Sequence, residues 1–236
     1  MKKLTLLLTI VSLAFVSGQA QTLDEVLAKH FEASGQKNLS AAKTIRISGK
    51  VVQMGMELPM VMKIKRPKKF RMEAEMQGQK MITAFDGENG WMIAPWISPD
   101  PQDLAGEQLK QAKEQADIDG DLYHYAEKGH TAKLLGKEDM EGTEVYKIQL
   151  NKKNGDTQYY YIDADSYILL KVTTKTQRQG NELEVENIFG NYKMINGVAM
   201  PMSIETKVMG QSSQIVFDSV QFNIDLPDSL FTKPEK

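Results

Sequence analysis

Apolar and polar residues alternate from Leu58 to Met76, and this stretch carries the clearest structural signal in the chain. The apolar residues that share one face are Leu58, Met60, Met62, Ile64, Phe70, Met72, Ala74 and Met76. Lysine, arginine and glutamate occupy most of the positions between them. Alternation with a period of two is typical of a half-buried antiparallel strand. We therefore predict two strands that meet near Pro67, because proline has no N–H to donate to a sheet.

Methionine dominates this apolar face, which leaves two interpretations open. Eight of the fourteen methionines lie between Met54 and Met92, and Trp91 and Trp96 lie beside them. Methionine is flexible and suits a surface that must fit many apolar shapes. Apolar residues on an inward-facing strand position are also the usual material of a packed core. The pattern alone does not decide between a core and an open binding face.

The sequence on both sides of this stretch predicts a mainly β fold. Thr22 and Glu25 form a capping box that predicts a helix from Leu23 to Ser34, and Gly35 suits the C-terminal end of that helix. The period then changes to two, and turn signals recur about every ten residues through most of the chain. This spacing predicts an antiparallel sandwich or barrel.

One segment interrupts the predicted strands. Ser98–Pro101 is expected to stop the sheet, and Gln102–Ala116 is expected to form a helix with a thin apolar stripe. Asp117–Asp121 could be mistaken for a calcium loop, but it lacks the spaced ligands and terminal glutamate of an EF-hand, so a solvated helix end is the simpler interpretation. No long polar linker divides residues 21–236, and we expect a single domain there.

Residues 1–20 have the composition of a secretory signal peptide. Lys2 and Lys3 precede an apolar run, Leu4–Val16, and Gly18–Ala20 offers a small-residue cleavage site. An uncleaved anchor is the alternative, but the run is shorter than the about 20 helical residues that span a bilayer. No other apolar run approaches this length, so we expect no transmembrane span in the mature chain.

Composition narrows the possible functions. Without residues 1–20 the chain carries 27 basic and 31 acidic side chains, and this acidic balance argues against nucleic-acid binding. The absence of cysteine excludes disulfides, a thiol nucleophile and a lipid-modified cysteine.

Candidate catalytic and metal-binding residues are few. No nucleotide-binding, serine-hydrolase or zinc-protease motif is present, and we expect neither an enzymatic activity nor a cofactor. His30 lies on the apolar edge of the first predicted helix, where a packing role is expected because no second ligand accompanies it. His124 and His130 are a weak signal for zinc, and no metal site is expected.

Three motifs, taken in order, resemble the periplasmic lipoprotein-carrier family, the LolA-like outer-membrane lipoprotein-sorting proteins. They are the helix Leu23–Ser34 followed by a strand Ile45–Met54, the run Lys65–Arg71, and Asp86–Trp91 leading to Pro95. The resemblance in order and spacing covers about residues 22–100.

The resemblance implies an unclosed, strongly curved antiparallel β-barrel with helices over its concave face. It also implies an exported, non-catalytic carrier that binds lipid or lipoprotein acyl chains in an apolar concave cavity. Such a carrier moves its cargo across the periplasm toward the outer membrane, between membrane-associated donor and acceptor proteins. The alternative is an exported interaction or sensor module on the same fold, with a packed core and no lipid ligand.

The resemblance also suggests site residues. The expected lipid contacts on the concave face are Met60, Met62, Ile64, Phe70, Met72, Met76, Met81, Trp91, Ile93 and Trp96. The rim arginine of the family would be Arg66, whose five N–H donors suit the free carbonyl groups at a helix end and would help to gate the cavity. A surface salt bridge is the alternative for Arg66. Gln102–Ala116 is more polar than the lid helices of the family.

Overall fold

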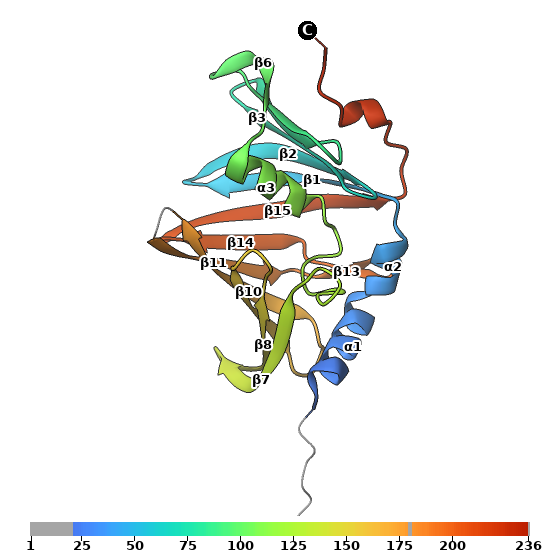
Figure 1. Ribbon diagram of the computed structural model, residues 1–236, viewed down its shortest axis with the longest axis vertical. Coiled ribbons are helices and arrows are strands. Elements are labelled where there is room, and N and C mark those ends of the chain that lie inside the picture. Colours follow the sequence, from blue (N-terminus) through green and yellow to red (C-terminus); the bar gives the residue numbers. More distant parts are fainter. Residues whose placement is uncertain (1–20, 179–180, 236) are drawn as a thin grey trace, which may run out of the picture.

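The computed structural model describes residues 21–178 and 181–235 (Figure 1). The predicted signal peptide, residues 1–20, lies outside the described residues. The helices are α1 (Leu23–Ser34), α2 (Gln36–Ala41), α3 (Gly106–Gln115) and the 3-10 turn η1 (Asp228–Leu230). The strands are β1 (Thr44–Gln53), β2 (Met56–Lys65), β3 (Lys69–Met76), β4 (Gln79–Phe85), β5 (Gly90–Ala94), β6 (Ser98–Asp103), β7 (Thr131–Met140), β8 (Thr143–Asn151), β9 (Thr157–Asp163), β10 (Leu169–Arg178), β11 (Asn181–Gly190), β12 (Lys193–Ile195), β13 (Val198–Met200), β14 (Ser203–Val208) and β15 (Gln211–Phe222).

Thirteen of these strands form one antiparallel sheet that does not close on itself. Its order is β6-β5-β4-β3-β2-β1-β15-β14-β11-β10-β9-β8-β7, so β6 and β7 are free edges, while β12 and β13 form a separate ribbon. The prediction of an unclosed antiparallel barrel is confirmed. The middle of the sheet joins the two ends of the chain, because β1 pairs with β15 from Ile45 opposite Phe222 to Val52 opposite Gln214.

The two strands predicted from the methionine-rich stretch are β2 and β3. Directly opposed residues of antiparallel strands lie on the same face, and Met60 pairs with Ala74, Met62 with Met72 and Ile64 with Phe70. We call this the inner face of the sheet. Lys63 and Arg71 pair on the outer face and both contact Glu73 there. The predicted alternation is therefore correct over these strands.

The expectation that Ser98–Pro101 stops the sheet is wrong, because these residues begin β6. β6 pairs with β5 at Ala94 opposite Ser98 and at Met92 opposite Gln102, and none of the described strands pairs with its other side. Pro99 and Pro101 are compatible with this position, since an edge strand does not need every N–H for pairing. The helix starts later than predicted, at Gly106.

Helices and one irregular segment cover the inner face (Figure 1). The predicted capping box of α1 is present, and Gly35 ends that helix with a φ of 71°. Val26 and Leu27 of α1 are buried in a core cluster with side chains of β8, β9 and β10. α3 packs on the sheet through Ala112, which shares a second cluster with Ile64 and Phe70. Residues 116–130, which we call the cover segment, follow α3.

The C-terminal segment, residues 225–235, lies on the outer face of β3, β4 and β5. Trp91 donates a hydrogen bond from Nε1 to the carbonyl of Phe231 at 2.7 Å, and Arg71 donates to the carbonyl of Leu230 at 2.7 Å. Lys65 and Lys69 both contact Asp228, and their hydrogen bonds lower the pKa of Asp228 to about 2. The segment is thus attached by polar bonds and by the buried ring of Phe231.

Candidate functional site

An apolar cavity of about 330 Å³ lies between the helices and the inner face of the sheet. Its walls come from α1, α2, β1, β2, β9, β10, β11, the cover segment, Ile168, Tyr192 and residues 198–201. Side chains that show its character are Phe31, Leu39, Ile47, Leu169 and Phe189. A cavity of this volume is near the lower end of the range for small-molecule sites, about 300–1,000 Å³, which are lined mostly by apolar groups.

The cover segment closes one side of this cavity. Leu122 is buried against α1 and the strands of the first core cluster, and Ile118 contacts the two clusters on the other side. Residues 118–123 all line the cavity. The position of this segment therefore determines how open the cavity is.

Arg66 fastens the cover segment to the rim of the sheet. Its guanidinium makes a two-fold ion pair with Asp119, with N–O distances of 2.6 and 2.8 Å. Arg66 also donates to the carbonyls of Leu39 and Ala42, at the C-terminal end of α2, at 3.1 and 2.8 Å. This side chain, from the turn after β2, thus joins the rim of the sheet to α2 and the cover segment, and we call the Arg66–Asp119 pair the clasp.

The surroundings of the clasp stabilise both charges. Partial burial raises the pKa of Asp119, but the hydrogen bonds and charge of Arg66, with Ser40 and Lys128, outweigh it, so the pKa lies below its ordinary value. The hydrogen bonds to Asp119 raise the pKa of Arg66 against the opposing effect of burial. Gln36 and Ser40 also donate to Asp119. The clasp is therefore fully ionised at neutral pH.

His30 lies in the wall of the cavity on α1, as a buried residue. Its Nδ1 lies 2.8 Å from the carbonyl oxygen of Tyr167, and since a carbonyl can only accept, Nδ1 carries the proton. Burial lowers the pKa of His30, although the hydrogen bond to Tyr167 acts in the opposite direction. The neutral ring joins α1 to the turn before β10, in agreement with the expected packing role.

Most of the predicted lipid contacts on β2 and β3 lie under α3 or in the core, outside the cavity. Met60, Ile64 and Phe70 are buried, while Met62 and Met72 are partly buried against the cluster beneath α3. Of the ten predicted residues, only Ile64 lines the cavity. Met81 pairs with Ala74 and shares the inner face, and Met76 lies at the end of the β3–β4 hairpin.

The expected placement of Trp91 and Ile93 beside the methionines is wrong. Trp91 pairs with Ala84, which pairs with Arg71, so its ring belongs to the outer face. Ile93 pairs with Ile82, opposite Glu73, and shares that face. Trp96 lies in the turn between β5 and β6 and is 49% exposed. No polar residues alternate with the apolar ones from Trp91 to Trp96, so the sequence does not indicate which of these side chains face the interior.

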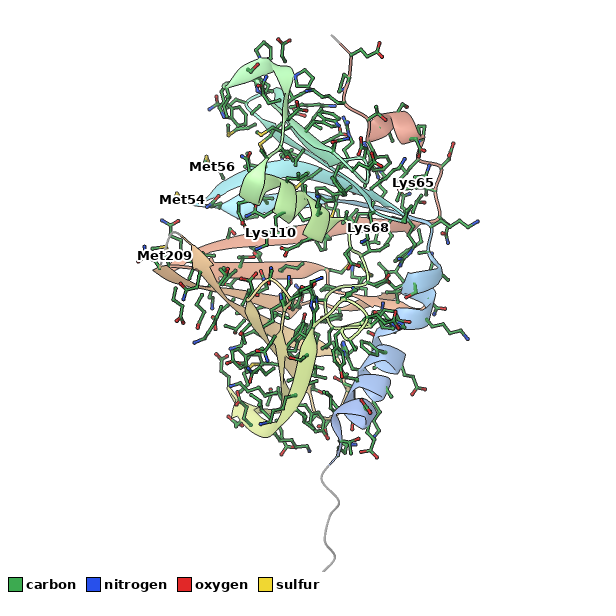
Figure 2. The ribbon with its side chains drawn as sticks, in the orientation of Figure 1. Met54, Met56, Lys65, Lys68, Lys110 and Met209 are labelled. Carbon is green, nitrogen blue, oxygen red and sulfur yellow. The ribbon has the colours of Figure 1, made fainter. Side chains whose placement is uncertain are left out.

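Some methionines do not face the interior at all. Met54 and Met56 lie at the β1–β2 hairpin tip, and Met209 lies at the β14–β15 tip; all three are exposed. Figure 2 shows them at the same end of the molecule. Apolar residues counted along the sequence therefore overstate the apolar area available inside.

No sequence motif singles out Asp119. It belongs to the acidic run that was interpreted as a solvated helix end, whereas it is the partner of Arg66. His124 is exposed beside Glu127, and His130 accepts from the backbone N–H of Lys153. Among residues 21–178 and 181–235, no group of three or more His, Cys, Asp or Glu side chains is placed to hold a metal ion.

None of the helices in the described part of the chain is both long and apolar enough to cross a membrane.

Known structures share this fold. A LolA superfamily protein from Nitrosomonas europaea is 17% identical, with a TM-score of 0.61 over 91% of this chain and 99% of that one. A putative outer membrane lipoprotein-sorting protein domain from Vibrio parahaemolyticus is 14% identical, with a TM-score of 0.59 over 87% and 97%. A DUF1329 family protein from Desulfovibrio piger is 14% identical, with a TM-score of 0.59 over 88% and 97%.

Sequence comparisons add one family. No curated protein matches the chain. A family model with the description "Uncharacterized protein" matches residues 61–235, which is well over half of the sequence. The chain therefore belongs to this family, and it has the LolA-like fold.

Proposed function

We propose that this protein is an exported, non-catalytic carrier that binds lipid or lipoprotein acyl chains. The observation that supports this best is the apolar cavity between the helices and the inner face of the unclosed sheet. Burial of each methylene group contributes about 0.8 kcal/mol, so an acyl chain needs no polar recognition to bind in such a cavity. The likeness to lipoprotein-sorting structures agrees with this proposal.

The proposal places the protein in the periplasm, between a membrane-associated donor and acceptor. It depends on removal of the predicted signal peptide at residues 1–20. A carrier has to release its cargo, so some part of the cavity wall must move. The cover segment is suited to this role, because the clasp attaches it to the rim by a small number of polar bonds.

The cavity also has room to grow into the methionine-rich inner face. Met62 and Met72 pack against the cluster beneath α3, and Ile118 of the cover segment packs against the same cluster. Displacement of α3 would join their surface to the existing cavity. We propose that Met60, Met62, Ile64, Phe70, Met72, Met76 and Met81 contact the acyl chain in that open state, whereas Trp91 and Ile93 on the outer face and Trp96 in its exposed turn do not.

The test is uptake of a fluorescent fatty-acid probe by the purified protein, together with native mass spectrometry for lipid that copurifies. Ser34 lines the cavity from α1, and a Ser34→Phe variant should lower the affinity for the probe severalfold because the ring occupies the cavity. Ala28 is exposed on the same helix and does not line the cavity, so Ala28→Phe is the matched control. We expect the control to bind the probe as the unchanged protein does.

Failure of the unchanged protein to take up the probe, with no copurifying lipid, would reject the proposed function. It would favour the second candidate, an exported interaction or sensor module without a lipid ligand. That candidate has one observation behind it: Met60, Phe70 and Ala74 of the inner face are buried in packed core clusters rather than exposed in the cavity.

A further inference from the structure

A second cleft, of about 740 Å³, lies between α3, the cover segment and the turn that joins β8 to β9. Its lining differs in kind from that of the apolar cavity, because it carries six lysines and three carboxylates, whose formal charges sum to +3. The lysines are Lys68, Lys110, Lys113, Lys128, Lys152 and Lys153. Figure 2 labels two of them, Lys110 on α3 and Lys68 in the turn after β2. The whole chain, by contrast, is slightly acidic.

The three carboxylates of this cleft are already paired. Lys128 contacts Asp117 at 2.7 Å, and Lys152 contacts Asp121 at 2.8 Å and Glu114 at 3.0 Å. The side chain of Lys152 is only 7% exposed, so these contacts hold it in place. The acidic groups of the lining are therefore neutralised by lysines of the same cleft.

Three lysines of the cleft remain without a carboxylate partner among the described residues. Lys68 lies in the turn after β2, Lys113 on α3 and Lys153 in the β8–β9 turn, so they come from three separate elements. Lys113 lies 5.9 Å from the ring centroid of Phe85, which carries no charge. Like charges that converge on one cleft repel each other, and a bound anion would relieve that repulsion.

The cleft lies next to the apolar cavity. Asp121 lines both, and residues 117–121 of the cover segment separate them. An amphiphile with its acyl chain in the cavity has an anion-binding surface on the other side of this short segment.

We infer that the cleft binds a phosphate-type anion, and that this anion is the head group of the carried lipid. The assignment to a lipid rests on the proposed function. A head-group site of this kind restricts the cargo to negatively charged lipids. A neutral head group would leave Lys68, Lys113 and Lys153 without a counter-charge.

The experiment compares three probes by isothermal titration calorimetry: dihexanoyl phosphatidylglycerol, dihexanoyl phosphatidylcholine and inorganic phosphate. The cleft variant combines Lys68→Gln, Lys113→Gln and Lys153→Gln. The control combines Lys37→Gln, Lys133→Gln and Lys193→Gln, which removes the same charge from exposed positions outside the cleft. All six side chains are exposed or lie in turns, and circular dichroism checks that both variants fold.

We expect the unchanged protein to prefer phosphatidylglycerol to phosphatidylcholine, and the cleft variant to lose about tenfold in affinity for phosphatidylglycerol. The control variant should bind as the unchanged protein does. Equal losses in both variants would overturn the site, since the effect would then come from overall charge.

The other outcomes separate this inference from the proposed function. Equal binding of the two lipids to the unchanged protein would overturn the head-group site and leave the carrier intact. Phosphate binding that the cleft variant loses, without binding of either lipid, would support the anion site, assign free phosphate as its ligand and reject the carrier. No binding of any probe would reject both.

Discussion

At the scale of single residues, the clasp places an ion pair that is largely withdrawn from water beside an apolar cavity. The side chains of Arg66 and Asp119 are 25% and 18% exposed. Removal of either partner leaves the other charge partly buried without its ion-pair partner. Removal of Arg66 also frees the carbonyls at the end of α2. The pair therefore affects both the stability of the closed state and the rate at which it opens.

We predict that Arg66→Leu lowers the free energy of unfolding by about 3 kcal/mol, because it leaves Asp119 without its main partner. Combination with Asp119→Leu should recover part of this loss, since the double variant no longer buries an unpaired charge. Urea denaturation of the four proteins in the cycle measures the coupling. If the losses in free energy of unfolding of the two single variants add up to that of the double variant, the pair is a surface salt bridge without a structural role. Faster release of a bound acyl probe from Arg66→Leu than from the unchanged protein would support a role in gating.

At the scale of elements, the C-terminal segment can be tested separately from the cavity. Phe231 is fully buried, and its carbonyl accepts the hydrogen bond of Trp91. We predict that Phe231→Ala loosens this segment and exposes Trp91, which shifts its fluorescence emission to longer wavelength. A Trp96→Phe background removes the exposed indole, so that the signal comes from Trp91 alone.

Thr232→Ala is the matched control for this change, because Thr232 lies next to Phe231 but is exposed. Its emission should equal that of the Trp96→Phe background. Unchanged emission in the Phe231→Ala variant would mean that the polar bonds from Trp91, Arg71 and the lysines at Asp228 are sufficient to hold the segment in place.

The elements also show which parts of the molecule could be predicted from the sequence. The phase of β2 and β3 could be predicted because lysine, arginine and glutamate separate their apolar residues. The phase of β5 could not, because its residues are almost all apolar and only the pairing of Trp91 with Ala84 assigns it to a face. The sequence does not predict the edge strand β6, because its prolines indicate a break in the sheet. Proline excludes a strand only where neighbours pair with both of its sides, and β6 pairs on one side.

The candidate site was only partly predictable for a similar reason. Arg66 was identified from the run Lys65–Arg71, and its bonds to the end of α2 agree with the expected chemistry. Asp119 lies 53 residues further along, and its pairing with Arg66 depends on how the cover segment lies on the sheet. Cavity walls likewise come from elements that meet only after folding.

At the scale of the whole molecule, the stability of the fold should decrease as the pH is lowered, in two separate pH ranges. The folded pKa of His30 is lowered, so its contribution is complete above the unfolded value of about 6.5 and is lost as pH falls through the folded value. The folded pKa of Asp119 is also lowered, so its contribution is present above the unfolded value of about 3.9 and is lost at lower pH.

We therefore predict that the melting temperature decreases first below about pH 6.5 and again below about pH 4. His30→Asn keeps a donor for the carbonyl of Tyr167 but cannot titrate, so it should remove the first decrease. His124→Asn is the control, because that side chain is exposed beside Glu127. Persistence of the first decrease in His30→Asn would assign it to another group. Thermal unfolding followed by circular dichroism from pH 8 to pH 3 measures both ranges.

The pairing of β1 with β15 has a consequence for the order in which the molecule can assemble. β1 begins at Thr44, and its partner β15 ends at Phe222. The seam between the two halves therefore pairs residues about three quarters of the chain apart, as in Ile45 with Phe222. During synthesis β1 has β2 on one side and nothing on the other until the last strand emerges. Contacts of such high sequence separation form slowly, and an unpaired edge invites pairing with other chains. The free edge of β1 is therefore open to pairing with other chains until β15 is available.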